Sequence, residues 1–136
     1  MKKCLIIDDS EVIREIIVRL VKDLGLEPLE ATSAGEGVEI CGGASPAVVL
    51  LDWDLPKMGA LDFLRGAGAM DADKRPEIVL CATENDHQQF TLAKAAGAKH
   101  HLLKPFNREM MEELFVAIGV LDGPAPQKAE SKASQG

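Results

Sequence analysis

Aromatic side chains are scarce in this chain, which has one Trp, four Phe and no Tyr among its 136 residues. Hydrophobic residues nevertheless make up 46% of the chain, and because few of them are aromatic, the predicted core is mainly aliphatic. Long apolar runs are also missing: those such as Ala47 to Leu51 fall far short of the roughly 20 residues that span a bilayer, so we expect no membrane insertion. The N-terminus enters a strand pattern without a signal peptide, which makes the cytoplasm the expected compartment.

Positive charge is in deficit, with 15 Lys and Arg against 22 Asp and Glu, and the formal net charge is −7. Nucleic acids are bound through cationic groups that neutralise phosphates, so no nucleic-acid partner is expected. Cysteine is limited to Cys4, Cys41 and Cys81, an odd number without paired spacing. We therefore expect small buried thiols, and neither a disulfide framework nor a zinc site.

A phosphate-binding glycine loop is missing too. Neither G-x-G-x-x-G nor the P-loop pattern follows the first predicted strand, where Asp8-Asp9-Ser10-Glu11 would repel a nucleotide phosphate. Nucleotide-binding and FMN-binding domains are therefore disfavoured. The motifs also contain no Ser-His-Asp or Cys-His arrangement.

Apolar runs rich in β-branched residues alternate with stretches of helical period, which is typical of βα units around a buried parallel sheet. The length favours one domain, at residues 1–122, and residues 123–136 are expected to form a disordered tail because they contain no large apolar side chain. The predicted strands are 4–7, 27–31, 47–51, 77–82 and 99–103; the predicted helices are 11–24, 33–41, 60–70, 87–96 and 107–121. Right-handed crossovers then give a doubly wound α/β domain.

Polar side chains stand where four of these strands end. Asp8 and Asp9 follow the first strand, Asp52 the third, Thr83 the fourth and Lys104 the fifth. In a doubly wound sheet the carboxyl ends of the strands share one edge, so these side chains are expected to meet in one crevice. Each residue by itself could be a turn former, a helix cap or a solvated charge, but unrelated turns give no reason for the whole set.

Clustered carboxylates repel one another, so this crevice needs a cation. Oxygen ligands select a hard ion such as Mg²⁺ or Mn²⁺ rather than zinc. A metal ion and the ammonium of Lys104 beside a carboxylate can stabilise negative charge on a phosphoryl group. Asp52, at the end of a central strand, is the expected phosphoryl acceptor because carboxylates can form acyl phosphates.

This ordered set resembles the receiver domain of two-component response regulators. The resemblance covers about residues 3 to 121 and rests on Asp8-Asp9, Asp52, Thr83 and Lys104-Pro105. The run Asp52-Trp53-Asp54-Leu55-Pro56, followed by Met58-Gly59, is similar to the single-domain, CheY-like group of receivers. The resemblance implies a flavodoxin-like α/β fold with five parallel strands in the order 2-1-3-4-5, flanked by five helices.

The resemblance also implies roles for these residues. Asp52 would accept a phosphoryl group from a histidine kinase or a histidine phosphotransfer protein, and the chain would otherwise show only slow autodephosphorylation. Mg²⁺ would be held by Asp9, Asp52, the backbone carbonyl of Asp54 and, through water, Asp8. Thr83 and Lys104 would contact the new phosphoryl group, and the surface of the last two helices and the fifth strand would then change to bind a downstream protein.

Residues next to the predicted site are expected to modify its switch and its phosphoryl chemistry. Glu84 stands where receivers generally have a small residue, and His101 where they have a rotating tyrosine or phenylalanine, so the switch at His101 is either weaker, sensitive to pH, or absent. The resemblance implies that Asn85 and Asp54 occupy positions that tune how fast the phosphoryl group is lost. Trp53 is expected to be a shield and a fluorescent reporter.

Three functions remain open at this point. The first is a stand-alone signalling receiver, serving either chemotaxis or a phosphorelay, which only the identity of its partner would separate. The second is a degenerate receiver that binds proteins without phosphorylation, which absence of Mg²⁺ binding would support. The third is a metal-dependent phosphatase-like hydrolase, because Asp54 lies two residues after the candidate nucleophile Asp52; turnover of a phosphate ester would reveal it.

Overall fold

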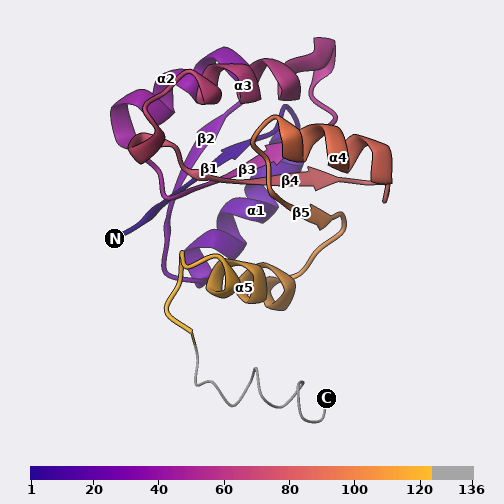
Figure 1. Cartoon of the computed structure of the whole chain (residues 1–136). Coiled ribbons are helices and arrows are strands. Elements are labelled where there is room, and N and C mark those ends of the chain that lie inside the picture. The colour runs from indigo at the N-terminus through magenta and orange to yellow at the C-terminus, as the bar shows by residue number, and fades with distance from the viewer. Residues whose placement is uncertain (124–136) are drawn as a thin grey trace.

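The computed structural model describes residues 1–123, so residues 124–136 of the predicted tail lie outside the described residues. Strands and helices alternate along the described chain (Figure 1). The strands are β1 (Lys3–Ile7), β2 (Glu27–Ala31), β3 (Val48–Asp52), β4 (Glu77–Ala82) and β5 (His100–Leu103). The helices are α1 (Glu11–Asp23), α2 (Ala34–Ala44), α3 (Gly59–Gly68), α4 (His87–Ala95) and α5 (Arg108–Ala117), with short 3-10 turns η1 (Pro56–Met58) and η2 (Ala72–Lys74).

The five strands form one parallel sheet in the order β2-β1-β3-β4-β5, which confirms the predicted fold class. Ile7 of β1 lies beside Leu51 of β3, and Asp52 lies beside Cys81 of β4. β1 and β3 are almost wholly buried, because helices cover both faces of the sheet. This register places the ends of the central strands at one edge.

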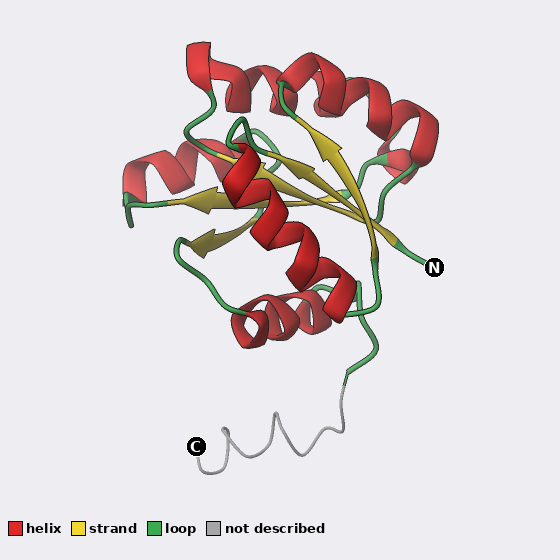
Figure 2. Cartoon of the chain, turned by 180° about the vertical axis from the view of Figure 1, so that it is seen from behind, coloured by secondary structure: helices red, strands yellow, loops and turns green. Residues whose placement is uncertain are grey.

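Two helical layers cover the sheet. Helices α2, α3 and α4 lie on one face and α1 and α5 on the other, as the two opposite views show (Figures 1 and 2). Phe63 is fully buried in the first layer and Phe115 in the second. Aliphatic side chains supply most of the remaining core, as the composition predicts. Among the described residues, the only buried charged side chains are those of Asp8 and Asp52.

Glycines end three of the helices. Gly25, Gly97 and Gly119 have φ of 85°, 120° and 85°, and in each case the next residue donates its N–H to a carbonyl five positions earlier. These bonds define the Schellman ending, in which glycine adopts the left-handed conformation at little cost. The predicted stops at Gly25 and Gly97 are confirmed. The predicted extension of the last helix to 121 is wrong, because Gly119 ends it.

The predicted end of the second helix at Cys41 is also wrong. α2 continues through Gly42 and Gly43 to Ala44 and ends at Ser45, which is left-handed with φ 51° and donates its N–H to the Cys41 carbonyl. Glycine disfavours a helix interior by about 1 kcal/mol, which tertiary packing can override. The other predicted bounds differ from the observed ones by at most two residues.

All three cysteines are buried and form no disulfide, as predicted. Within residues 1–123, no helix combines the length and the apolar character that crossing a membrane requires.

Candidate functional site

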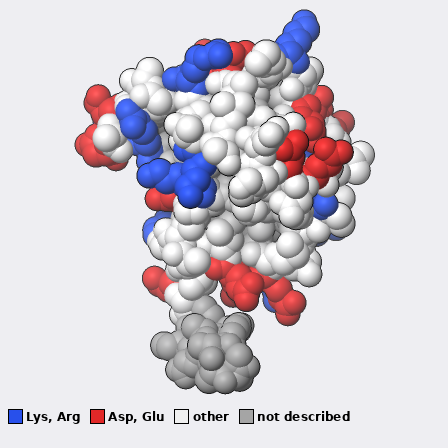
Figure 3. All heavy atoms as spheres, turned by 45° about the vertical axis from the view of Figure 1, so that its right-hand side comes forward, with Lys and Arg blue, Asp and Glu red and all other residues white. Residues whose placement is uncertain are grey.

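The carboxyl edge of the sheet gathers the residues that the sequence singles out. β1 ends next to Asp8, β3 ends at Asp52, and the backbone N–H of Lys104 donates to the Ala82 carbonyl at 2.8 Å, which aligns the ends of β4 and β5. The right-hand side of Figure 1, toward which β4 points, comes forward in Figure 3, where acidic side chains gather on the right and at the lower edge and basic ones mainly on the left and at the top.

Three carboxylates form the centre of this edge. Asp8, Asp9 and Asp52 each place a carboxylate oxygen within 4.8 Å of the others. Asp8 and Asp52 are only 3% and 5% exposed, whereas Asp9 is exposed and leaves the cluster open to solvent on one side. Three oxygen ligands at this spacing, one of them accessible, fit a hard divalent cation.

Lys104 supplies the positive charge inside the cluster. Its Nζ lies 2.9 Å from Asp52 Oδ1 and 3.5 Å from Asp8 Oδ2. Burial by itself lowers the pKa of Lys104, but the hydrogen bond to Asp52 and the attraction of both carboxylates outweigh burial, so the pKa is raised. The ammonium therefore stays charged at neutral pH and compensates part of the negative charge.

Backbone donors orient the two buried carboxylates. Ser10 N–H donates to Asp8 Oδ1 at 2.8 Å, and Asp54 N–H donates to Asp52 Oδ1 at 3.0 Å. Burial raises the pKa of Asp8; the Ser10 N–H opposes this rise, and the Asp52 carboxylate adds to it. A raised carboxyl pKa means that the folded protein disfavours the ionised form of Asp8, chiefly because the group is buried, and a bound cation would offset this cost.

Sequence reasoning missed a residue that contacts Asp8. Arg14 of α1 donates from Nη1 to the Asp8 backbone carbonyl at 2.8 Å and from Nε to Glu30 Oε1 at 3.0 Å. It ties the start of α1 and the end of β2 to the residue that follows β1. Its place in the sequence, one turn after the Ser10 cap, carries no signal for this contact.

Four other predicted residues lie on the loops that follow β3 and β4. Thr83 directly follows β4, and Glu84 and Asn85 continue the loop; all three side chains are exposed. Asp54 is exposed on the loop after β3, and its backbone N–H donates to Asp52 Oδ1.

Trp53 and His101 lie on the side that α4 covers. Trp53 is half-buried against the core shared by α2, α3 and α4, and its backbone N–H donates to the Cys81 carbonyl at 2.9 Å. His101 is exposed and stacks on Phe90 of α4, with ring centroids 4.2 Å apart. Phe90 was not singled out from the sequence. Pro105 follows Lys104 through a cis peptide bond.

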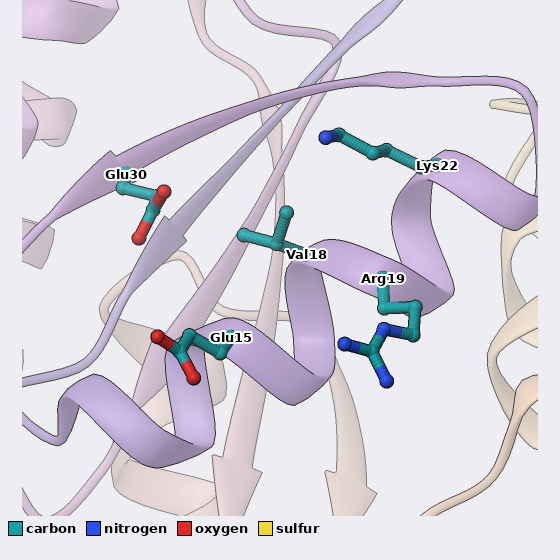
Figure 4. A pocket seen from close by; sticks show the side chains of 5 residues that line it. All are labelled: Glu15, Val18, Arg19, Lys22 and Glu30. Atoms are coloured by element: carbon teal, nitrogen blue, oxygen red, sulfur yellow. The ribbon is translucent and has the colours of Figure 1, made fainter.

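Two hollows lie outside the carboxylate cluster. One, of about 350 Å³, is lined by the charged side chains of α1 and β2 and by Val18; Figure 4 shows Glu15, Val18, Arg19, Lys22 and Glu30 around it. The other, of about 290 Å³, lies between α4 and β5 and includes Asn85 and His101 in its lining. Neither hollow is lined by Asp8, Asp9 or Asp52.

Comparison with known proteins agrees with this geometry. The model of the response regulator receiver domain matches residues 4–115. Chemotaxis protein CheY1 of Helicobacter pylori is 32% identical over 123 residues, which cover 88% of this chain and 99% of that protein. Chemotaxis protein CheY of Pseudomonas aeruginosa is 29% identical over 117 residues, covering 85% of this chain and 94% of that protein.

A solved structure shows the same likeness. Chemotaxis protein CheY4 of Vibrio cholerae superposes with a TM-score of 0.78 and 30% sequence identity, covering 89% of this chain and 99% of that one. The family match spans most of the chain, from β1 into α5, and the chain therefore belongs to the response regulator receiver family.

Proposed function

We propose that this protein is a stand-alone, phospho-accepting response regulator, in which Asp52 takes a phosphoryl group from a histidine kinase or a histidine phosphotransfer protein. The observation that supports this most is the buried Asp52 carboxylate, 2.9 Å from the Lys104 ammonium and within 4.8 Å of Asp8 and Asp9. A structural ion pair alone would not need two further acids at the same place. The protein then acts as a signalling module and not as an enzyme with a released product.

Mg²⁺ is the proposed cofactor. The side chains of Asp8, Asp9 and Asp52, together with the backbone carbonyl of Asp54, are the oxygen ligands that would hold it. When bound, it supplies positive charge that offsets the charge of an incoming phosphoryl group.

The chain's own residues then have separate tasks. An oxygen of Asp52 forms a bond to phosphorus while the bond between phosphorus and the donor imidazole nitrogen breaks. The Asp54 N–H and the Lys104 ammonium, which already contact Asp52 Oδ1, hold the carboxylate in one orientation. Lys104 also compensates the charge that the phosphoryl group adds, and the Thr83 hydroxyl at the end of β4 is the group proposed to bind it.

The proposed output is a change in the surface formed by α4, β5 and α5, to which a downstream protein binds. Thr83 leads through Asn85 into α4, and His101 of β5 stacks on Phe90 of α4, so a shift of Thr83 toward the phosphoryl group bears on this contact. Because the relatives are named chemotaxis proteins, we propose a role in chemotaxis or motility, with a phosphorelay as the other setting. The proposed compartment is the cytoplasm.

One observation favours a second candidate, a receiver that binds proteins without phosphorylation. Glu84 is an exposed acid next to Thr83, and His101 replaces the expected tyrosine or phenylalanine. Both changes bear on the switch, whereas the intact carboxylates and Lys104 oppose this candidate; absence of Mg²⁺ binding would support it. A phosphatase-like hydrolase is not favoured, because the described chain has no inserted domain between its elements to hold a substrate.

Trp53 fluorescence tests the proposal. The full chain is titrated with Mg²⁺ and then with beryllofluoride, which mimics a phosphoryl group on a carboxylate. We expect a saturable change in each step, loss of the beryllofluoride step in Asp52→Asn, and weaker Mg²⁺ binding in Asp9→Asn. Asp71→Asn removes an exposed acid outside the cluster and should behave as the unmodified protein. No response to either reagent in the unmodified protein would overturn the proposal and support the second candidate.

A further inference from the structure

Every polar atom of Asp8 has a partner in the structure. Its backbone N–H donates to the Ala31 carbonyl at 3.1 Å, and its backbone carbonyl accepts from Nη1 of Arg14 at 2.8 Å. Its Oδ1 accepts from the Ser10 N–H at 2.8 Å, and its Oδ2 lies 3.5 Å from Nζ of Lys104. Two of these partners are side chains. Lys104 belongs to the proposed phosphoryl site, whereas Arg14 has no task in the function proposed above.

The Arg14 side chain is fixed at two points. Besides its bond to the Asp8 carbonyl, its Nε donates to Glu30 Oε1 at 3.0 Å, and the side chain is only 14% exposed. Strand register places Glu30 of β2 beside Ile6 of β1, two residues before Asp8. Because the donors of a guanidinium lie in one rigid plane, the contact at Nε also fixes the direction in which Nη1 points.

Glu30 pairs with Arg14 although other cations lie on the same side of β2. Arg19 and Lys22 of α1 line one hollow together with Glu30 (Figure 4). Within residues 1–123, the ion pair of Glu30 is the one with Arg14. Arg19 therefore provides a matched reference for Arg14, because it is the same side chain on the same helix, exposed and without a contact to Asp8.

Three effects of Arg14 on a cation held by the carboxylates differ in sign. As a positive charge it would repel the cation, so its removal would tighten cation binding. As a purely structural group it would change the stability of the fold and leave the cation affinity unchanged. As a group that holds Asp8 in place it would raise the affinity, so its removal would weaken binding. The 2.8 Å bond to the Asp8 carbonyl favours the third effect, because hydrogen bonds from a charged donor are strong and directional.

We propose that Arg14 is a positioning residue: anchored on Glu30, it holds the backbone of Asp8 so that the carboxylates keep the spacing that a cation needs. The inference rests on the proposed function, because it concerns the affinity of the same site for Mg²⁺. Mg²⁺ demands a near-ideal arrangement of its oxygen ligands, so a small displacement of one of them lowers the affinity. Loss of Arg14 therefore weakens Mg²⁺ binding and leaves the phosphoryl chemistry of Asp52 intact once Mg²⁺ is bound.

Two substitutions in the full chain test this role. Arg14→Met removes the guanidinium and keeps an apolar stem, whereas Arg14→Lys keeps the positive charge but cannot make both contacts. Titration with Mg²⁺, followed by Trp53 fluorescence, should give a dissociation constant about tenfold higher for Arg14→Met, the lower end of the effects of groups that support metal ligands. Arg14→Lys should give an intermediate value. Arg19→Met, the matched control, should bind Mg²⁺ as the unmodified protein does.

Two further measurements separate positioning from damage to the fold. Phosphorylation by acetyl phosphate should be slower in Arg14→Met at low Mg²⁺ but reach the rate of the unmodified protein to within about twofold when Mg²⁺ saturates. Urea unfolding with a chelator measures the stability of each variant without the metal. If Arg14→Met shows no cooperative unfolding transition, the Mg²⁺ affinity of Arg14→Lys decides.

The contradicting results are distinct from a failure of the proposed function. Mg²⁺ dissociation constants of Arg14→Lys and the unmodified protein that are equal would overturn the positioning role, as would a lower urea midpoint of Arg14→Met with unchanged Mg²⁺ affinity. Tighter Mg²⁺ binding by Arg14→Met would overturn it too, and would show that Arg14 acts as a repelling charge. In these cases the phospho-accepting function stands, whereas absence of any Mg²⁺ response in the unmodified protein would overturn both.

Discussion

Lys104 is expected to stabilise the fold through the carboxylates that it contacts. Lys104→Met keeps the length and the apolar stem of the side chain but removes the ammonium. In the metal-free protein this change leaves Asp52 and Asp8 buried without the charge that lies 2.9 Å and 3.5 Å from them. Their mutual repulsion with Asp9 is then uncompensated.

The magnitude follows from burial. Removing one partner of a buried ion pair costs about 3–5 kcal/mol, and since the Lys104 side chain is 17% exposed we expect a loss of about 2–3 kcal/mol in the free energy of unfolding. With a urea dependence of about 1.5–2 kcal/mol per molar for a domain of this size, the midpoint should fall by about 1–2 M. The folded-state pKa of Lys104 is raised above its ordinary 10.5, so this stabilisation is fully present at neutral pH and is lost only as the pH rises through the folded value.

Urea unfolding in the presence of a chelator, followed by Trp53 fluorescence, measures this loss. Lys99→Met, which removes an exposed lysine before β5, should change stability by less than about 0.5 kcal/mol. Adding Mg²⁺ should restore more stability to Lys104→Met than to the unmodified protein, because the ammonium no longer repels the cation. An unfolding midpoint of Lys104→Met equal to that of Lys99→Met would refute the electrostatic account of the site.

Two further predictions concern the packing. Gly66→Ala places a Cβ 2.6 Å from Val38 Cγ2 and should destabilise the protein by about 1–3 kcal/mol. Gly42→Ala meets no atom within 4 Å and should stabilise it by about 0.5–1 kcal/mol. Thermal unfolding measures both changes, and equal shifts would contradict the close approach of α2 and α3. The cysteines are buried, and burial raises the pKa of Cys41 to about 11 and that of Cys81 to about 12. The native protein should therefore react with a thiol reagent at about pH 8 far more slowly than the unfolded chain. Rapid reaction of the native form would contradict this burial.

The fold could be predicted from the sequence because the signals for its strands and helices are local and repeated. Strands of four to six residues alternate with helices whose ends are marked by Ser10, Ser33, Gly25 and Gly97. The errors arose at two helix ends where the local signals conflict. α2 passes through Gly42 and Gly43, although the sequence there resembles a helix stop. The stop at Gly119 was overlooked because apolar residues continue to Leu121 beyond it.

Part of the candidate site could also be predicted from the sequence. Asp8 and Lys104 directly follow strands and Asp52 is the last residue of one. Parallel strands bring their carboxyl ends to one edge, so the proximity of these residues follows from topology. The support of Asp8 by Arg14 and the stacking of His101 on Phe90 depend on side-chain directions between elements far apart in sequence. Such contacts have no spacing in the sequence that would predict them.

Phosphoryl transfer to Asp52 is the central claim, and mass spectrometry tests it most directly. The full chain is incubated with a small phosphodonor such as acetyl phosphate, with Mg²⁺ or with a chelator, and the intact mass is measured and the modified residue mapped. We expect one added phosphoryl group, present only with Mg²⁺, mapped to Asp52 and absent from Asp52→Asn. An unchanged mass with Mg²⁺, or the same modification in Asp52→Asn, would contradict the account.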